Sequence, residues 1–205
     1  MKNDVRDGRG IPDDYQLAGR WQLHLKGGTL VVLLAFGVVL FGLTIVLGLA
    51  VRVLLRGPFE GTVSISGSGL LFLPILLGVF IAFFVLHEAI HGALFLVFGG
   101  KPRFGAKVIG RFFPVAFYAT SGAPLSRNQY LLVALAPFFL LTPAFLLIGL
   151  LADAQGTIAL AMVAAAMNAG GSAADLMAGG KIWRGSRETL YEDTESGFNW
   201  YVPST

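Results

Sequence analysis

The sequence predicts an all-α polytopic membrane protein with four transmembrane helices and a small β-hairpin in the cytoplasmic loop between the second and third helices. Hydrophobic residues make up 55% of the 205 residues. Charged residues make up only 13%, about half of the roughly 25% that is usual in soluble domains. Four apolar stretches are each long enough to cross a bilayer core, which takes roughly 20 helical residues. Most of the chain is therefore expected to lie in a lipid bilayer.

The rest of the composition limits which metal ligands the chain can use and which kinds of partner it can bind. Cysteine is absent, so the chain has no disulfides, and any metal site must use histidine and carboxylate ligands. The net charge is only +3, and the sequence contains no basic stripe with interleaved aromatic residues. We therefore expect the bilayer, and no nucleic acid, among its partners.

The first segment, residues 1–29, is polar and is expected on the cytoplasmic side. A short helix at the membrane surface is predicted from Tyr15, Leu17, Trp21 and Leu25. Residues 30–51 carry no charge and form the first predicted span. This stretch is too long for the apolar region of a signal peptide, which predicts an uncleaved anchor.

The second predicted span covers residues 70–98, after a short loop in which residues 62–66 alternate like a strand. The third covers residues 131–152 and contains Pro137 and Pro143. Prolines at these positions are expected to kink the helix and to free backbone carbonyls.

A basic loop, residues 99–130, connects the second and third spans. Its runs 104–109 and 113–120 alternate like strands, which predicts a β-hairpin. Ser126 is placed to cap the helix that follows.

The fourth predicted span, residues 156–180, is rich in alanine and glycine, which predicts a central helix packed closely on its neighbours. The tail, residues 181–205, is expected in the cytoplasm, with a strand or a membrane-surface contact at 198–202. Its acidic residues are interpreted as a solvated face: Glu188, Glu192, Asp193 and Glu195. We therefore expect one membrane-embedded domain, residues 30–180, between two cytoplasmic segments.

The distribution of basic residues predicts the orientation in the membrane. With four spans, the N-terminal segment, the basic loop and the tail share one side. Of the 15 lysines and arginines, only Arg52 and Arg56 fall on the other side. Both termini are therefore expected in the cytoplasm.

The second span contains an HExxH motif, His87-Glu88-Ala89-Ile90-His91. Residues four apart lie on one face of a helix, so His87 and His91 can present two imidazoles to one metal ion. Glu88 can then reach a metal-bound water and act as the catalytic base. A chance match is expected in roughly one shuffled sequence of this composition per thousand. Ionisable groups in hydrocarbon are costly, which also indicates a functional site.

Asp175, the only charge in the fourth span, is the predicted third ligand. His87 lies about 26 Å from the start of the second span, and Asp175 lies about 28 Å from the start of the fourth. These two spans run in the same direction across the membrane. A lone aspartate at that depth needs a partner, either the metal or a backbone or water contact. Asn168, seven residues earlier on the same helical face, is a candidate donor to the reacting carbonyl oxygen, or a packing amide.

Three pieces of the sequence resemble the site-2 proteases, a family of membrane-embedded zinc metalloproteases. They are the motif at residues 87–92, the stretches 124–130 and 134–137, and residues 168–175. Within that wider group the chain most resembles the small bacterial and archaeal proteins called putative zincin peptidases. The resemblance covers roughly residues 70–180. One departure is that no proline precedes Asp175, and Leu176 follows it where site-2 proteases usually have glycine.

This resemblance implies one zinc ion per chain, held by His87, His91 and Asp175, in an integral protein of a prokaryotic cell membrane. It also implies hydrolysis of peptide bonds in a membrane or membrane-adjacent protein, with Glu88 activating the attacking water. Two other classes stay open. A non-catalytic scaffold or regulator could keep the zinc site. An ion-handling transporter could keep the same side chains, although no repeat halves are found in the sequence.

Overall fold

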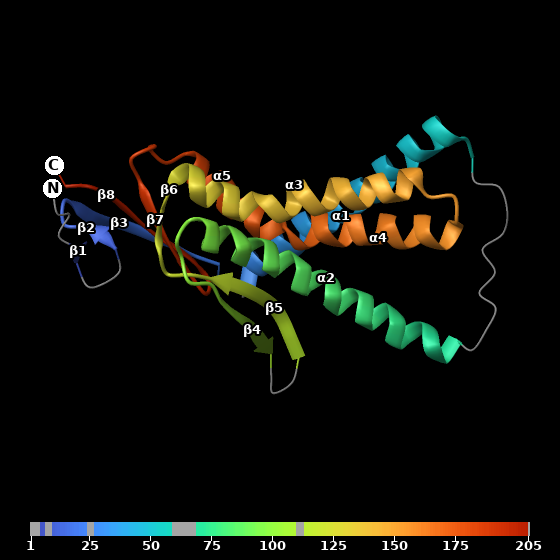
Figure 1. Ribbon diagram of the computed structural model, residues 1–205, viewed down its shortest axis with the longest axis horizontal. Coiled ribbons are helices and arrows are strands. Elements are labelled where there is room, and N and C mark those ends of the chain that lie inside the picture. Colours follow the sequence, from blue (N-terminus) through green and yellow to red (C-terminus); the bar gives the residue numbers. More distant parts are fainter. Residues whose placement is uncertain (1–4, 7–9, 24–26, 59–68, 110–112, 205) are drawn as a thin grey trace. The chain divides into compact units, whose positions relative to one another are not determined.

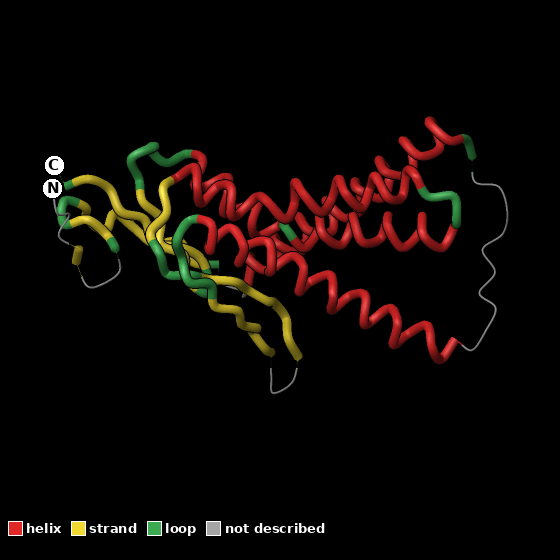
Figure 2. The backbone as a smooth tube through the Cα atoms, viewed as in Figure 1, coloured by secondary structure: helices red, strands yellow, loops and turns green. Residues whose placement is uncertain are grey.

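The computed structural model describes residues 5–6, 10–23, 27–58, 69–109 and 113–204 (Figure 1). In these ranges the chain forms helices and short strands, coloured red and yellow in Figure 2. The helices are α1 (Gly27–Arg56), α2 (Gly69–Val97), α3 (Arg127–Leu151), α4 (Gln155–Gly171) and α5 (Ala173–Trp183). The strands are β1 (Val5–Arg6), β2 (Ile11–Pro12), β3 (Tyr15–Gln22), β4 (Arg103–Ile109), β5 (Phe113–Thr120), β6 (Pro124–Ser126), β7 (Leu190–Thr194) and β8 (Gly197–Pro203). The strand-like run at 62–66 lies outside the described residues.

The long helices follow the apolar stretches because a backbone in lipid must satisfy its hydrogen bonds internally. Among the described residues, α1 and α3 are long and apolar enough to cross a membrane. The bent pair α4 and α5 makes a third span if it is counted as one. In α2, residues 81–97 form a shorter apolar helix. These helices indicate a multi-pass membrane protein, and the fourth span stays a prediction.

The start of α3 is fixed by a capping box, as the position of Ser126 predicts. The backbone N–H of Ser126 donates to Gln129 Oε1 at 2.9 Å, and the N–H of Gln129 lies 3.5 Å from Ser126 Oγ. This reciprocal pair satisfies amide groups that a helix start leaves without partners.

The fourth predicted span is broken rather than continuous. Gly170 and Gly171 weaken the end of α4, since glycine is a poor helix former. Ser172 follows as the C-cap, and its hydroxyl donates to the Asn168 carbonyl at 2.8 Å. A new helix, α5, begins at Ala173, so Asp175 lies in its first turn, where the helix dipole favours a carboxylate.

The N-terminal segment is a strand, so the prediction of a surface helix there is wrong. Tyr15, Leu17 and Trp21 are spaced by even numbers, which fits the two-residue period of a strand as well as a helical face. The decisive factor is pairing with the tail. β3 pairs antiparallel with β8 from Tyr15↔Pro203 to Gln22↔Gly197, with a bulge between Leu17 and Gly19. Such a partner cannot be read from local sequence.

The chain is therefore mostly helical with small antiparallel sheets. It contains more strands than the single hairpin that was predicted beside the helices. The largest sheet has the strand order β3-β8-β7-β6, and β1 pairs with β2. The predicted hairpin is confirmed: β4 pairs with β5 from Arg103↔Thr120 to Ile109↔Phe113. The strand predicted at 198–202 is also confirmed, as part of β8.

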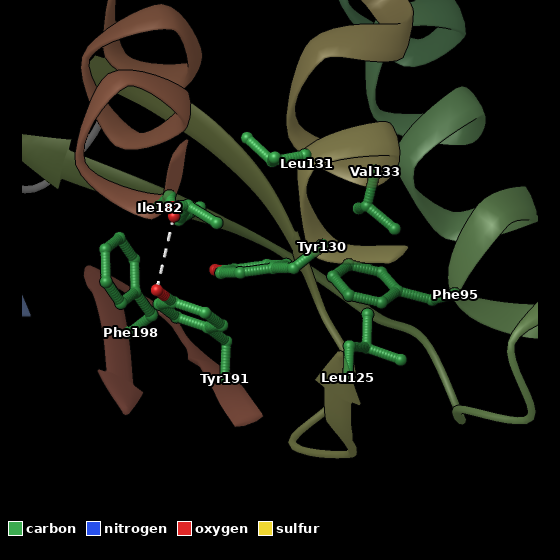
Figure 3. Close-up of a cluster of buried hydrophobic side chains, with 8 residues drawn as sticks. All are labelled: Phe95, Leu125, Tyr130, Leu131, Val133, Ile182, Tyr191 and Phe198. Atoms are coloured by element: carbon green, nitrogen blue, oxygen red, sulfur yellow. Dashed lines mark hydrogen bonds between the residues drawn. The ribbon is translucent and has the colours of Figure 1, made fainter. Parts of the chain in front are cut away.

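The chain divides into two compact units. The first contains residues 1–30, 88–136 and 174–205, and the second contains residues 31–87 and 137–173. The first unit has a cluster of buried apolar side chains with Tyr130 in its middle (Figure 3). Its members are Phe95, Leu125, Tyr130, Leu131, Val133, Ile182, Tyr191 and Phe198. The cluster packs α2, the start of α3 and the end of α5 against the tail hairpin, which is formed by β7 and β8. One of its members, Val133, also contacts His91 through its carbonyl oxygen.

The acidic tail is not a uniformly solvated face, and that prediction is wrong for two of its four residues. Glu188 and Glu195 are exposed, as expected. Glu192 is buried, and its Oε2 accepts from the Tyr201 hydroxyl at 2.7 Å and from Asn199 Nδ2 at 2.9 Å. Asp193 carries a buried carboxylate oxygen. Both lie on β7, the strand between β6 and β8 in the largest sheet.

The second unit is packed through small residues, as the composition of α4 predicts. A Cβ atom added to Gly37 of α1 would lie 2.9 Å from the Gly170 carbonyl oxygen, and the reverse holds for Gly170. Only glycine permits so close a backbone approach. Five of the six alanines of α4 are buried: Ala161, Ala164, Ala165, Ala166 and Ala169.

Candidate metal centre

The HExxH motif lies on α2, which places its two histidines one turn apart on a single helical face. His87 is 6% exposed and His91 is 8% exposed, so both imidazoles are buried. Glu88 follows His87 in sequence and is half-buried. The motif therefore has the helical geometry that the sequence predicts.

His91 is oriented by a carbonyl that a proline sets free. Its Nδ1 lies 2.8 Å from the carbonyl oxygen of Val133 on α3. In a regular helix the residue four positions later would donate to that oxygen, but here it is Pro137, which has no N–H. A carbonyl only accepts, so Nδ1 of His91 must carry the proton. The Nε2 lone pair then remains for a metal, and this atom lies 3.7 Å from Asp175 Oδ2.

His87 is held in a similar way by a side chain. Its Nδ1 lies 2.9 Å from Asn168 Oδ1 on α4. The Nδ2 group of Asn168 donates to the Pro137 carbonyl at 2.9 Å and to Thr142 Oγ1 at 2.7 Å. Asn168 is fully buried, at 0% exposure. The role of oxyanion donor predicted for Asn168 stays a prediction.

His87, His91 and Asp175 form a cluster that could hold a metal ion. One ligand atom from each lies within 4.8 Å of the other two. In tetrahedral zinc sites with bonds of about 2.0–2.1 Å, ligand atoms lie about 3.3 Å apart, so the three ligand atoms would move closer together when the ion binds. Two neutral imidazoles and one carboxylate make a ligand set known for catalytic zinc, with a fourth position left for water. The donor chemistry and the engaged Nδ1 atoms therefore fit zinc.

Comparison with known families identifies the group of proteins to which the chain belongs. The family described as "Putative zincin peptidase" matches residues 80–190, which is more than half of the chain. The chain belongs to this family. The matched range contains His87, Glu88, His91, Asn168 and Asp175. No curated protein and no solved structure matches the chain.

Membership in the zincin peptidase family implies zinc as the metal of this cluster. It also indicates a metallopeptidase, since zincins use two histidines of HExxH as ligands and its glutamate as base. The site predicted from the sequence and the family description therefore agree on the chemical class.

One acidic residue near the centre was missed by the sequence reasoning. Asp193 of β7 accepts a hydrogen bond at Oδ1 from the Tyr130 hydroxyl on α3. It lies close enough to His91 and Asp175 for its charge to be affected by both. The contact joins residues 63 positions apart. Because no local pattern marks it, only the folded tail hairpin reveals it.

Asp193 is partly exposed as a residue, but its Oδ2 atom is buried and has no hydrogen-bond partner among the described residues. Burial raises the pKa of the Asp193 carboxyl from 3.8 to about 7, although the hydroxyls of Thr120 and Tyr130 beside it favour the charged form. The folded protein therefore takes up a proton that the unfolded chain lacks between about pH 4 and pH 7. Stability should fall as the pH rises through that window, by up to about 4 kcal/mol.

Asp193→Asn is expected to raise the apparent Tm of the zinc-free protein at pH 8 and to leave it nearly unchanged at pH 4. The amide keeps an acceptor for Tyr130 and removes the cost of burying a charge. Each kcal/mol should shift Tm by roughly 2–4 °C in a protein of this size. Thermal unfolding of both proteins in detergent at one scan rate measures the effect. A lower Tm for Asp193→Asn at pH 8 would contradict this assignment.

Proposed function

We propose that this protein is a zinc-dependent intramembrane endopeptidase, related in arrangement to the site-2 proteases. The observation that carries the proposal is the cluster of His87, His91 and Asp175, with Glu88 beside the first ligand on an apolar helix. An ordinary structural zinc site uses four protein ligands, whereas three leave a position for a reacting water.

The residues of the site have separate roles in this reaction. His87, His91 and Asp175 would hold the ion, and the acceptors at both Nδ1 atoms would keep the imidazoles turned toward it. Zinc, when bound, acidifies a water toward a pKa of about 7 and polarises the peptide carbonyl. Glu88 accepts the proton of the attacking water and then delivers it to the leaving nitrogen.

The membrane setting suggests the class of substrate. Four spans with both termini in the cytoplasm would place the site toward the cytoplasmic side of the bilayer, where water must reach it. A transmembrane helix hides its amides in hydrogen bonds, so a substrate segment must unwind locally before cleavage. We therefore propose membrane or membrane-adjacent proteins as substrates.

Removing the metal tests this function without knowledge of the natural substrate. The purified protein is incubated with solubilised membrane proteins, and new peptide N-termini are quantified by mass spectrometry. Chelation should remove these N-termini, and about one equivalent of added zinc should restore them. If zinc-loaded protein yields no new N-termini over a protein-free control, the peptidase proposal is wrong and a zinc-binding scaffold is favoured.

A further inference from the structure

The Asn168 side chain has a single orientation, which its partners decide. The Pro137 carbonyl can only accept a hydrogen bond, so the amide atom 2.9 Å from it must be the donor Nδ2. Thr142 Oγ1 accepts the second Nδ2 hydrogen at 2.7 Å. The other amide atom, Oδ1, is therefore the one that faces His87. A flipped amide would put two acceptors against each other at Pro137.

This orientation places a proton on Nδ1 of His87. Oδ1 of Asn168 is an acceptor, so the Nδ1 atom 2.9 Å away must carry a proton. A neutral imidazole with a proton on Nδ1 has its lone pair on Nε2, and that lone pair is the one that a metal can bind. The Val133 carbonyl does the same for His91. Both histidines are thus set to offer the same nitrogen.

We propose that Asn168 is a positioning residue that holds His87 in the metal-binding tautomer, with Thr142 and the Pro137 carbonyl locking the amide in place. Both amide hydrogens are already engaged, so a reacting carbonyl oxygen could use them only after one of these bonds breaks. The inference rests on the metal-binding part of the proposed function and not on peptide hydrolysis.

The alternative is that Asn168 merely packs α4, and a nearby residue separates the two ideas. Ser172 lies one turn later and is also 0% exposed. Within the described part of the chain, its hydroxyl hydrogen-bonds only to the backbone carbonyl of Asn168. Ser172→Ala therefore removes a buried hydrogen bond of α4 without touching His87. It is the matched control for Asn168→Ala.

Zinc affinity, measured by competition with a chromophoric chelator, tests the proposal. Asn168→Ala should weaken zinc binding roughly 10–100-fold, the usual cost of losing a hydrogen-bond partner of a metal-bound histidine. Thr142→Val keeps the hydrogen bond from Asn168 to the Pro137 carbonyl, so this substitution should weaken zinc binding by much less. Ser172→Ala should match the wild type. The Tm of each zinc-free variant reports the packing cost separately.

Two results would overturn the assignment. One is wild-type zinc affinity in a folded Asn168→Ala protein. The other is an equal loss of affinity in Asn168→Ala and Ser172→Ala, which would make packing of α4 the cause. Failure of the wild type itself to bind zinc is a different outcome, because it would refute the proposed function rather than this role of Asn168 alone.

Discussion

Glu88→Gln is expected to abolish peptide-bond cleavage while leaving zinc in place. Glutamine has nearly the same shape but cannot take a proton from the attacking water. A positioned general base contributes roughly 10²–10⁴-fold to the rate, so the loss should be at least of that order. The measurement pairs two quantities on the same sample: zinc per chain and the rate of appearance of new N-termini.

Glu195→Gln is the matched control for this substitution. Glu195 is an exposed acid in the turn between β7 and β8, and the same chemical change there should leave both quantities at wild-type values. Cleavage at the wild-type rate by a zinc-loaded Glu88→Gln protein would remove Glu88 from the mechanism. Loss of zinc from Glu88→Gln would instead show that Glu88 helps to hold the metal.

Asp175→Ala should cost the protein its zinc. Asp175 supplies the only carboxylate of the three-residue cluster, and its Oδ2 lies beside His91 Nε2. Loss of an outer hydrogen-bond partner typically costs 10–100-fold in affinity, so loss of a direct ligand should cost more than about 100-fold. The expected result is that Asp175→Ala emerges from purification with little zinc and no cleavage activity.

Asp153→Ala serves as the control for Asp175→Ala. The Asp153 side chain is 89% exposed and pairs with Arg56, so its removal should leave the zinc content unchanged. If Asp175→Ala kept wild-type zinc affinity, the hydrolase could stand, but a different residue would have to be the third ligand. The structure offers a nearby carboxylate to examine in that case, Asp193.

The cluster of His87, His91 and Asp175 could be predicted from sequence because its parts follow helical periodicity. His87 and His91 are four residues apart, and Asp175 was placed by counting residues along two apolar helices that run in the same direction. The structure brings these three together. Pro137 was also predicted to free a carbonyl, which is the Val133 oxygen that orients His91.

The features that were missed depend on contacts between distant parts of the chain. Trp21 and Phe198 have ring centroids 5.2 Å apart. The sequence around each residue nevertheless gives no indication that β3 pairs with β8. Asp193 seemed solvated because its neighbours in sequence are acidic. The contact of Asn168 with His87 joins residues 81 positions apart. The spacing of apolar residues indicates which face of a helix or strand a residue lies on. It does not indicate which other element of the fold that face contacts.

The most direct test of the account is the metal content of the wild-type protein, combined with X-ray absorption at the zinc edge. The account predicts about one zinc per chain, with nitrogen and oxygen ligands at about 2.0–2.1 Å and the scattering of two imidazole rings. Asp175→Ala, purified side by side, should show a clear loss. Absence of zinc from carefully handled wild type, or a first shell without imidazole, would contradict the central claim that His87, His91 and Asp175 form a zinc centre.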